Sequence, residues 1–444
     1  MKKRSRSFAR RGAAAPAASG RDVALPRLVT IEKAIYGGAS LARVEGKAMF
    51  VPLTLPGEQA RVRIVEEKRG YATAELEDIV AAAPARVAPN CKHFGTCGGC
   101  QYQHAEYKAQ IEMKQAILRE TLERGGVRAP DEIAVLAGEP WAYRNRIRLA
   151  FDAAGRPGYR GRRSHAVVAI DECPIAAPVL VQAAFRAAEL FRLFAIPSRP
   201  AELALFCDAA EESMLASVFT EGAARVPLRD YFDALLSQIP SLRGVELMEV
   251  HQGQTRTVAR AGAESIAYRA AGFDYRVDHG AFFQVNRWLV DPLVGCVTSG
   301  LHGGLAWDLF AGVGLFARKL AERFERVIAV ESAAAAIAAL KENLTGTHAA
   351  AAKATTLEFL RGAVSGERPD LIVVDPPRMG LGPETTELLG RISAPELVVV
   401  SCDPATLARD LRVLVGAGYL IESTTLADLF PQTFHLETVV RLRR

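Results

Sequence analysis

The chain of 444 residues lacks any uninterrupted run of roughly 18 apolar residues, the length that a membrane-spanning helix requires. It also has no apolar stretch behind its basic N-terminus, which a secretory signal would need. Its seven cysteines are odd in number, and three of them fall within ten residues, which does not fit a disulfide scaffold. We therefore expect a protein of the reducing cytoplasm with no membrane partner.

An excess of charge of one sign is also missing. Lys and Arg number 55 against 50 Asp and Glu, and the net charge of +5 is too small by itself to indicate nucleic-acid binding. The basic residues are unevenly placed, however, and six of them lie near the start of the chain: Lys2, Lys3, Arg4, Arg6, Arg10 and Arg11. The following residues are rich in Ala, Pro, Ser and Gly and cannot bury a core. We predict a disordered tail over residues 1–21; an electrostatic arm for a phosphate backbone is the alternative.

The length predicts about three domains, at roughly 150 residues each. We place them at residues 22–82, 83–270 and 271–444. Over residues 27–80, short alternating strands are separated by glycine turns such as Gly37-Gly38 and Gly46. This pattern predicts a small five-stranded barrel of the OB type. Such barrels bind single-stranded nucleic acid or serve only as scaffolds.

A cysteine motif follows the predicted barrel. Three cysteines occur in the spacing Cys-x5-Cys-Gly-Gly-Cys, at positions Cys91, Cys97 and Cys100. Three thiolates so close together indicate a metal site, and a fourth ligand is then required. Cys173, which precedes a proline, is the candidate, and the set favours an iron–sulfur cluster. Zinc held by the three cysteines and His93 or His104 is the alternative.

Arginines alternate along residues 143–149. Arg144, Arg146 and Arg148 would share one face of a strand, and Arg160, Arg162 and Arg163 follow shortly afterwards. Like charges in a row repel unless an anion is near, so we predict a phosphate-binding surface. A solvated strand face is the alternative. Residues 176–268 show helix-like and strand-like segments without recognisable chemistry, which predicts an α+β central domain.

The C-terminal part has the alternation of a doubly wound α/β fold. We predict strands at residues 304–309, 327–330, 371–374 and 397–401, and helices at 315–324 and 333–344. The first strand runs into the turn Asp308-Leu309-Phe310-Ala311-Gly312-Val313-Gly314. Asp308 would repel a pyrophosphate, whereas Glu331, at the end of the second strand, suits ribose hydroxyls. Together they favour S-adenosylmethionine over a nicotinamide cofactor.

Cys402 lies at the tip of a predicted strand, directly before a helix that starts at Pro404. In open α/β sheets ligands bind at the carboxyl ends of the strands, so this position suits a nucleophile. An isolated cysteine is otherwise commonly an inert buried side chain. For a reactive thiol, we expect the helix start and nearby cations to lower its pKa.

Several of these motifs resemble known families. Gly37-Gly38 through Leu55-Pro56-Gly57-Glu58 resembles a TRAM domain, an RNA-binding barrel of RNA-modifying enzymes. The segment from Cys91 to Gln110 resembles the cluster-binding segment of bacterial uracil-5 RNA methyltransferases, with Cys173 at the distant fourth ligand. Residues 401–410 carry the most specific likeness. The resemblance covers nearly all of residues 27–441, is weakest over 176–268, and implies a structural or RNA-organising [4Fe-4S] cluster.

The resemblance also implies roles for individual residues. Carbon 5 of uracil becomes nucleophilic only after a thiolate adds to carbon 6, and the carbon 5 proton must later be removed by a base. Cys402 matches the family's nucleophile and Glu437 its base, whereas His435 is the alternative base because a histidine pKa lies near 7. Contacts to S-adenosylmethionine and the target base fall on Gln284, Phe310, Glu331 and Asp375.

Some positions depart from the family pattern: Leu315 replaces a frequent polar residue, Gln432 a frequent histidine, and Thr355 stands nearest the usual adenine contact. We nevertheless expect a class I, Rossmann-like methyltransferase domain joined to a TRAM barrel and an iron–sulfur central domain. The expected partner is RNA, 23S ribosomal RNA first and transfer RNA second, bound by a monomer. Cytosine-5 methylation is disfavoured because the motif after residue 374, Asp-Pro-Pro-Arg, lacks a second cysteine. A non-catalytic RNA-binding iron–sulfur protein is the remaining alternative.

Overall fold

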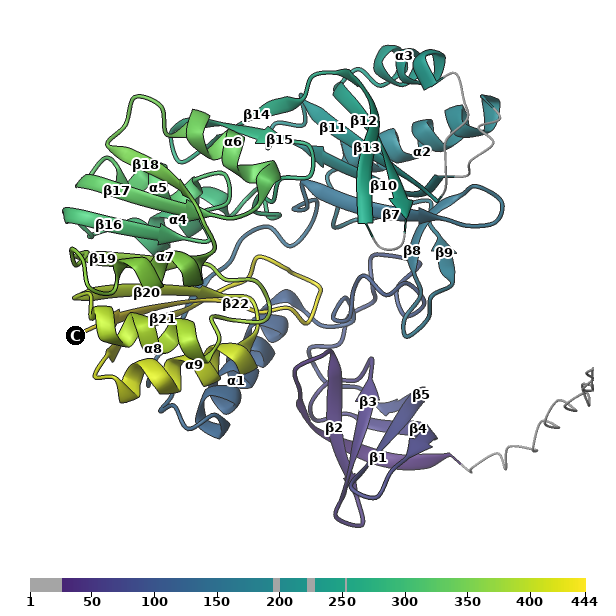
Figure 1. The fold of residues 1–444 in the computed structure, drawn as a ribbon. Coiled ribbons are helices and arrows are strands. Elements are labelled where there is room, and N and C mark those ends of the chain that lie inside the picture. Colours follow the sequence, from purple (N-terminus) through teal and green to yellow (C-terminus); the bar gives the residue numbers. More distant parts are fainter. Residues whose placement is uncertain (1–25, 195–199, 222–227, 252–253) are drawn as a thin grey trace, which may run out of the picture.

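The computed structural model describes residues 26–194, 200–221, 228–251 and 254–444, and the basic residues of the predicted tail lie outside these ranges. An N-terminal barrel, a central sheet and a C-terminal α/β region follow one another (Figure 1). None of the helices in the described ranges is both long and apolar enough to cross a lipid bilayer.

The N-terminal barrel is closed by five strands in the order β1-β2-β3-β5-β4. The chain folds this way because apolar and polar residues alternate: Val29 and Ile31 of β1 point inward, between exposed neighbours. The structure confirms the predicted barrel. Its strands are β1 (Arg27–Ala34), β2 (Ala39–Val44), β3 (Lys47–Pro52), β4 (Gln59–Glu67) and β5 (Tyr71–Ala81).

The central sheet has seven strands in the order β13-β12-β11-β10-β7-β8-β9. Helices α2 (Pro178–Leu193) and α3 (Leu228–Gln238) pack on one face, where Ile147 and Leu149 of β7 are buried. Arg146 and Arg148 lie on the other face, as the alternation predicted. The strands are β7 (Arg146–Phe151), β8 (Pro157–Arg160), β9 (Val167–Ala169), β10 (Pro200–Cys207), β11 (Met214–Glu221), β12 (Leu242–His251) and β13 (Gln254–Gly262).

The C-terminal region is a doubly wound sheet in the order β18-β17-β16-β19-β20-β22-β21-β6. The first five of these strands are parallel and β22 runs antiparallel to both neighbours. Its strands are β16 (Gly303–Leu309), β17 (Phe324–Glu331), β18 (Ala349–Lys353), β19 (Leu371–Val374), β20 (Glu396–Ser401), β21 (Leu420–Ala427), β22 (Glu437–Arg443) and β6 (Ala134–Leu136). The predicted doubly wound fold is therefore confirmed.

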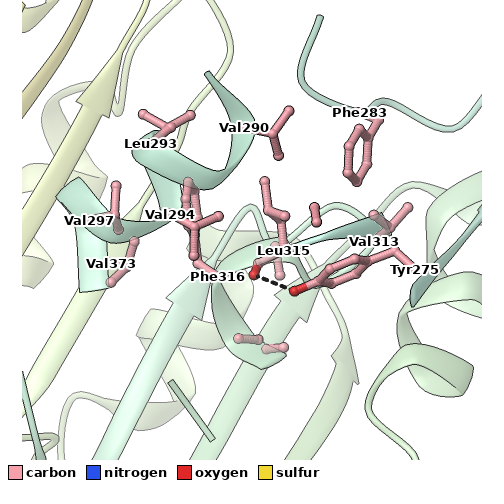
Figure 2. Close-up of a cluster of buried hydrophobic side chains, with 14 of the residues drawn as sticks. Tyr275, Phe283, Val290, Leu293, Val294, Val297, Val313, Leu315, Phe316 and Val373 are labelled. Atoms are coloured by element: carbon pink, nitrogen blue, oxygen red, sulfur yellow. Dashed lines mark hydrogen bonds between the residues drawn. The ribbon is translucent and has the colours of Figure 1, made fainter. Parts of the chain in front are cut away.

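Helices cover both faces of this sheet. On one face a hairpin, β14 (Ser265–Ala270) and β15 (Phe273–Asp278), joins α4 (Val290–Thr298), α5 (Leu315–Leu320) and α6 (Ala334–Asn343) in a core that Figure 2 shows in part. There the Tyr275 hydroxyl donates to the Leu315 carbonyl at 3.1 Å. The predicted helix over 315–324 is too long, because Phe324 is buried as the first residue of β17. The other face is covered by α7 (Thr356–Ala363), α8 (Pro383–Ile392), α9 (Pro404–Gly416) and α1 (Tyr107–Arg124).

Two elements that precede the central sheet in sequence pack with the C-terminal region. Strand β6 pairs in parallel with β21, and α1 lies along α9, where Leu118 and Leu411 share one core. Figure 1 shows α1 beside α9, below the sheet. The chain thus contributes α1 and β6 to the C-terminal region, then forms the central sheet, and afterwards completes the C-terminal region.

Candidate active site

The residues predicted to bind the cofactor gather at the carboxyl ends of the parallel strands. Asp308 lies near the end of β16, Glu331 ends β17, and Asp375 follows β19. Cys402 follows β20, the next strand in the sheet. Parallel strands end at the same edge of a sheet, where open α/β folds bind ligands in a crevice, so these four residues, far apart in sequence, meet at that place.

The turn between β16 and α5 shapes the floor of this crevice. Phe310 and Gly314 adopt left-handed backbone angles, with φ of 65° and 91°. A side chain at position 314 would come within 2.7 Å of Leu340, so the turn requires glycine there. The Glu331 carboxylate accepts backbone N–H groups of Gly312 at 2.9 Å and of Ala333 at 2.6 Å. These bonds hold the glycine turn against the end of β17.

Asp308 is fully buried beneath this turn. Its Oδ2 accepts the Ala317 N–H at 2.8 Å, while its Oδ1 is buried without a hydrogen-bond partner in the described part of the chain. Burial raises the pKa of Asp308 to about 8, and the nearby carboxylates of Asp375 and Glu331 add to the effect. An unsatisfied acceptor of this kind fits a ligand that brings a hydrogen-bond donor or a positive charge.

Gln284 reaches the same crevice from the loop before α4. Its Nε2 donates to Asp375 Oδ2 at 3.3 Å. The loop is held by Asn145, whose Nδ2 donates to the Gln284 carbonyl at 2.9 Å and whose backbone N–H donates to the Val285 carbonyl. Burial raises the pKa of Asp375 to about 7, and the hydrogen bond from Gln284 opposes that rise.

Cys402 lies at the start of α9, as predicted. Asp403 caps the helix by accepting the N–H groups of Ala405 at 3.0 Å and Thr406 at 2.9 Å. The expectation of a lowered thiol pKa was wrong for the protein without RNA. Burial raises the pKa of Cys402 to about 12, the carboxylates of Glu437 and Asp375 raise it further, and Arg378 opposes them. Burial, together with the surrounding acids, therefore outweighs the helix start and Arg378.

Glu437, the first residue of β22, is buried at the same place. Burial raises the pKa of its carboxyl well above the ordinary value, Asp375 adds to this, and Arg378 opposes it. His435, two residues earlier, is held by burial and by Arg378 at a lowered pKa of about 4. The pKa expected of His435 near neutrality was therefore wrong, and this removes the reason for which it was the alternative to Glu437.

Sequence reasoning missed two residues of the site. Arg378 belongs to a motif that drew attention for its aspartate, yet it is the cation that acts on both Cys402 and Glu437. Tyr36 comes from the N-terminal barrel, where its ring meets Phe434 edge-on at 5.5 Å. Its hydroxyl lies beside Asp403 and near Cys402, and burial raises the pKa of that hydroxyl. No periodicity in the barrel sequence could have indicated this contact.

The four predicted metal ligands, Cys91, Cys97, Cys100 and Cys173, line one cavity of about 60 Å³. The Cys173 Sγ accepts the Tyr159 hydroxyl at 3.7 Å. Of the two histidines proposed for zinc, His93 lines the cavity but contacts Asp171 at 2.7 Å, and His104 is not part of the lining. Among the residues that the structure describes, no three His, Cys, Asp or Glu side chains are close enough to hold a single metal ion.

Comparisons with known proteins agree with this geometry. The family model of tRNA (uracil-5-)-methyltransferases matches residues 263–444, and the TRAM domain model matches residues 27–76. An RNA methyltransferase from Streptomyces avermitilis is 34% identical, over 93% of this chain and 97% of that protein. The 23S rRNA (uracil(1939)-C(5))-methyltransferase RlmD of Pseudomonas entomophila is 32% identical over 96% of both chains.

A solved structure is similar over almost the whole length. The Pyrococcus abyssi tRNA (uracil-54, C5)-methyltransferase, in complex with S-adenosyl-L-homocysteine, aligns with a TM-score of 0.75 and 26% identity. The alignment covers 93% of this chain and all of that one. With the barrel, the strand-end crevice and full-length relatives in agreement, the chain belongs to the RNA uracil-5 methyltransferase family, whose members depend on S-adenosylmethionine.

Proposed function

We propose that the protein methylates carbon 5 of a uracil in RNA, with 23S ribosomal RNA as its target. The Cys402 thiolate bonds to carbon 6 of the ring, and the displaced electron pair makes carbon 5 nucleophilic. S-adenosylmethionine, when bound near Asp308 and Glu331, supplies the methyl group. Glu437 then takes the carbon 5 proton, the ring double bond re-forms, and the Cys402 thiolate leaves.

The observation that carries this proposal is the meeting of Cys402, Glu437 and Asp375 in one buried crevice. Each affects the ionisation of another, so all three lie within electrostatic reach. A thiol for addition and a carboxyl for deprotonation are the two groups that the chemistry needs. The hydrogen bond from Gln284 to Asp375 supports the contact with cofactor and base that we assign to Gln284. The uracil must leave its stack to reach this depth, at a cost of a few kcal/mol.

We further infer that the four cysteines hold a [4Fe-4S] cluster. All four thiols line one cavity, and an all-cysteine set of four ligands is the one that a [4Fe-4S] cluster takes. The ligands come from two segments, residues 91–100 and Cys173, so a cluster would tie the cysteine motif to the segment that follows β9 of the central sheet. We assign it a structural role, because no catalytic step above requires an electron.

The choice of ribosomal RNA rests on the relatives. Relatives named RlmD match this chain over nearly its whole length, at 31%, 32% and 33% identity. Transfer RNA is the second candidate, since the structural neighbour is named for uracil 54 of transfer RNA. Either role implies a cytoplasmic protein.

Methyl transfer can be tested with labelled cofactor and purified protein. We expect label on uracil in a 23S ribosomal RNA transcript, less on transfer RNA, and none on a transcript whose pyrimidines are all cytosine. Cys402→Ala should abolish transfer while it still binds S-adenosylmethionine. Label on cytosine would indicate the cytosine-5 reaction, and no label in any RNA would indicate a non-catalytic RNA-binding protein. Full transfer by Cys402→Ala would exclude that thiol as the nucleophile.

A further inference from the structure

A groove of about 470 Å³ lies between the barrel and the central sheet. Four arginines line it, Arg148, Arg160, Arg162 and Arg163, and none of the described acidic residues does. The barrel contributes Gly37, Gly38, Ala39 and Pro52 to the lining. The space beside Gly37 is open, since a side chain there would meet no atom within 4 Å.

The arginines carry more positive charge than the described carboxylates neutralise. Arg148 and Arg160 share one partner, Glu202, at 2.6 and 3.6 Å. No ion pair is formed by Arg162 or Arg163 within the described residues, and the Nη1 of Arg162 is buried without a hydrogen-bond partner. Burial, followed by repulsion from Arg163, lowers the pKa of Arg162, and the carboxylate of Glu75 opposes this only in part. An anion placed here would satisfy the free donor and relieve the repulsion.

The loop that carries these arginines is fixed to the cysteine motif. The Gly98 N–H donates to the Arg160 carbonyl, and the Arg162 N–H donates to the Thr96 carbonyl, both at 3.0 Å. Arg163 has a left-handed backbone with φ of 55°, which few arginines adopt. Its side chain is exposed at the groove. The backbone that carries these arginines is thus fixed before any ligand arrives.

One end of the groove adjoins the catalytic crevice through Gln101. This groove residue donates its backbone N–H to the Gln432 carbonyl at 2.9 Å and accepts the Phe434 N–H on its side chain at 3.3 Å. Phe434 lies three residues before Glu437. On the barrel side, Gly37 directly follows Tyr36, which also reaches the crevice. An RNA strand that lies in the groove could therefore run on directly to a target base in the catalytic crevice.

We propose that this groove binds the phosphates of the single-stranded RNA segment that flanks the target uracil, an inference that rests on the proposed function. Arginine is the residue best suited to phosphate oxygens, because its guanidinium offers several fixed donors. The contacts position the strand and carry no sequence information. The groove thereby determines on which side of the unstacked uracil the flanking RNA strand is bound to the protein.

The test compares Arg162→Gln/Arg163→Gln with a control pair, Arg128→Gln/Arg229→Gln, whose side chains are 91% and 92% exposed and lie outside the groove. RNA affinity is measured against salt concentration with a 23S ribosomal RNA fragment. Each lost phosphate contact should flatten the logarithmic salt slope by about 0.7. We expect the groove pair to flatten it by roughly 1.4, to weaken binding on the order of tenfold, and to raise KM with kcat unchanged.

Arg163→Gln alone should show half of the change in slope. Because Arg163 is exposed, this single variant should fold normally and keeps the test valid if the double variant misfolds. Affinity and slope equal to those of the control pair would overturn the proposal, and so would a loss of kcat at unchanged KM. If the wild-type protein bound RNA with the expected slope but transferred no methyl group, the proposed function would fail while the groove would stand.

Discussion

At the scale of single residues, Cys402 is surrounded by groups that oppose its ionisation. Burial and two carboxylates raise its pKa to about 12, so the thiol form predominates at neutral pH in the absence of RNA. Arg378 and a backbone hydrogen bond at Cys402 itself favour the thiolate, but they do not offset this rise. Attack on uracil therefore depends on the small thiolate fraction or on transfer of the thiol proton as the base enters. Glu437 is protonated more readily than an ordinary glutamate, since its pKa is also raised.

Glu437→Gln tests the second half of the chemistry. The amide cannot accept the carbon 5 proton, so the RNA should remain bonded to Cys402, and turnover should fall by roughly 10²–10⁴-fold. A protein–RNA adduct should accumulate on denaturing gels. Below the raised pKa of Cys402, each increase in pH raises the thiolate fraction, so the adduct should form faster as pH rises. The double variant Cys402→Ala/Glu437→Gln is the control and should give no adduct; normal release of RNA by Glu437→Gln would refute the assignment.

At the scale of elements, helix α1 holds the segment that leads into β22. Lys114 is fully buried, and its Nζ donates to Asp428 Oδ1 at 2.6 Å and to the Phe430 carbonyl at 3.0 Å. One turn earlier, Gln110 exchanges two hydrogen bonds of 2.9 Å with Gln432. Gln432 itself has a left-handed φ of 67°. These contacts fix the path of the chain toward Glu437.

Lys114→Met measures how much this anchoring contributes to stability. It leaves the buried Asp428 carboxylate without its cation, which typically lowers the free energy of unfolding by about 3–5 kcal/mol. Lys108→Met, on the same helix with a side chain that is 88% exposed, should change it by less than about 0.5 kcal/mol. Chemical denaturation provides both values. Equal stability of the two variants would show that the buried pair is dispensable.

At the scale of the whole molecule, the cysteine cavity lies where the parts of the chain meet. Arg144 lines the cavity, its backbone N–H donates to the Ile175 carbonyl, and it forms a bridge with Asn286. Asn286 lies two residues after Gln284, in the loop before α4. Through Arg144, the cysteine cavity is therefore connected to the loop that carries Gln284 into the active site.

Cys173→Ala should remove one ligand of the proposed cluster. We expect loss of iron and of visible absorbance, together with a lower Tm, because ligands from two segments would no longer be joined. Cys296→Ala, at a cysteine outside the cavity, should keep both signals. Elemental analysis separates the alternatives: zinc in the wild-type protein, or full iron content in Cys173→Ala, would contradict the assignment.

The sequence by itself predicted most elements and the place of the site. Alternation of apolar residues predicted the barrel and the face of β7, and strand–helix alternation predicted the doubly wound sheet. Asp308, Glu331, Asp375 and Cys402 could be placed together because parallel strands end at one edge. The resemblance to the methyltransferase family added Gln284 and Glu437, which spacing alone does not single out.

Only the tertiary structure decided the electrostatics and the contacts between distant segments. The expected fall in the pKa of Cys402 is a rise, because burial and the charges of Asp375 and Glu437 act through space and leave no local pattern. The same holds for Tyr36, which reaches the crevice from the barrel, and for α1, which packs against α9. Periodicity reports which face of an element is buried, but the partner of that face is set by long-range packing, and so is the ionisation of every group buried there.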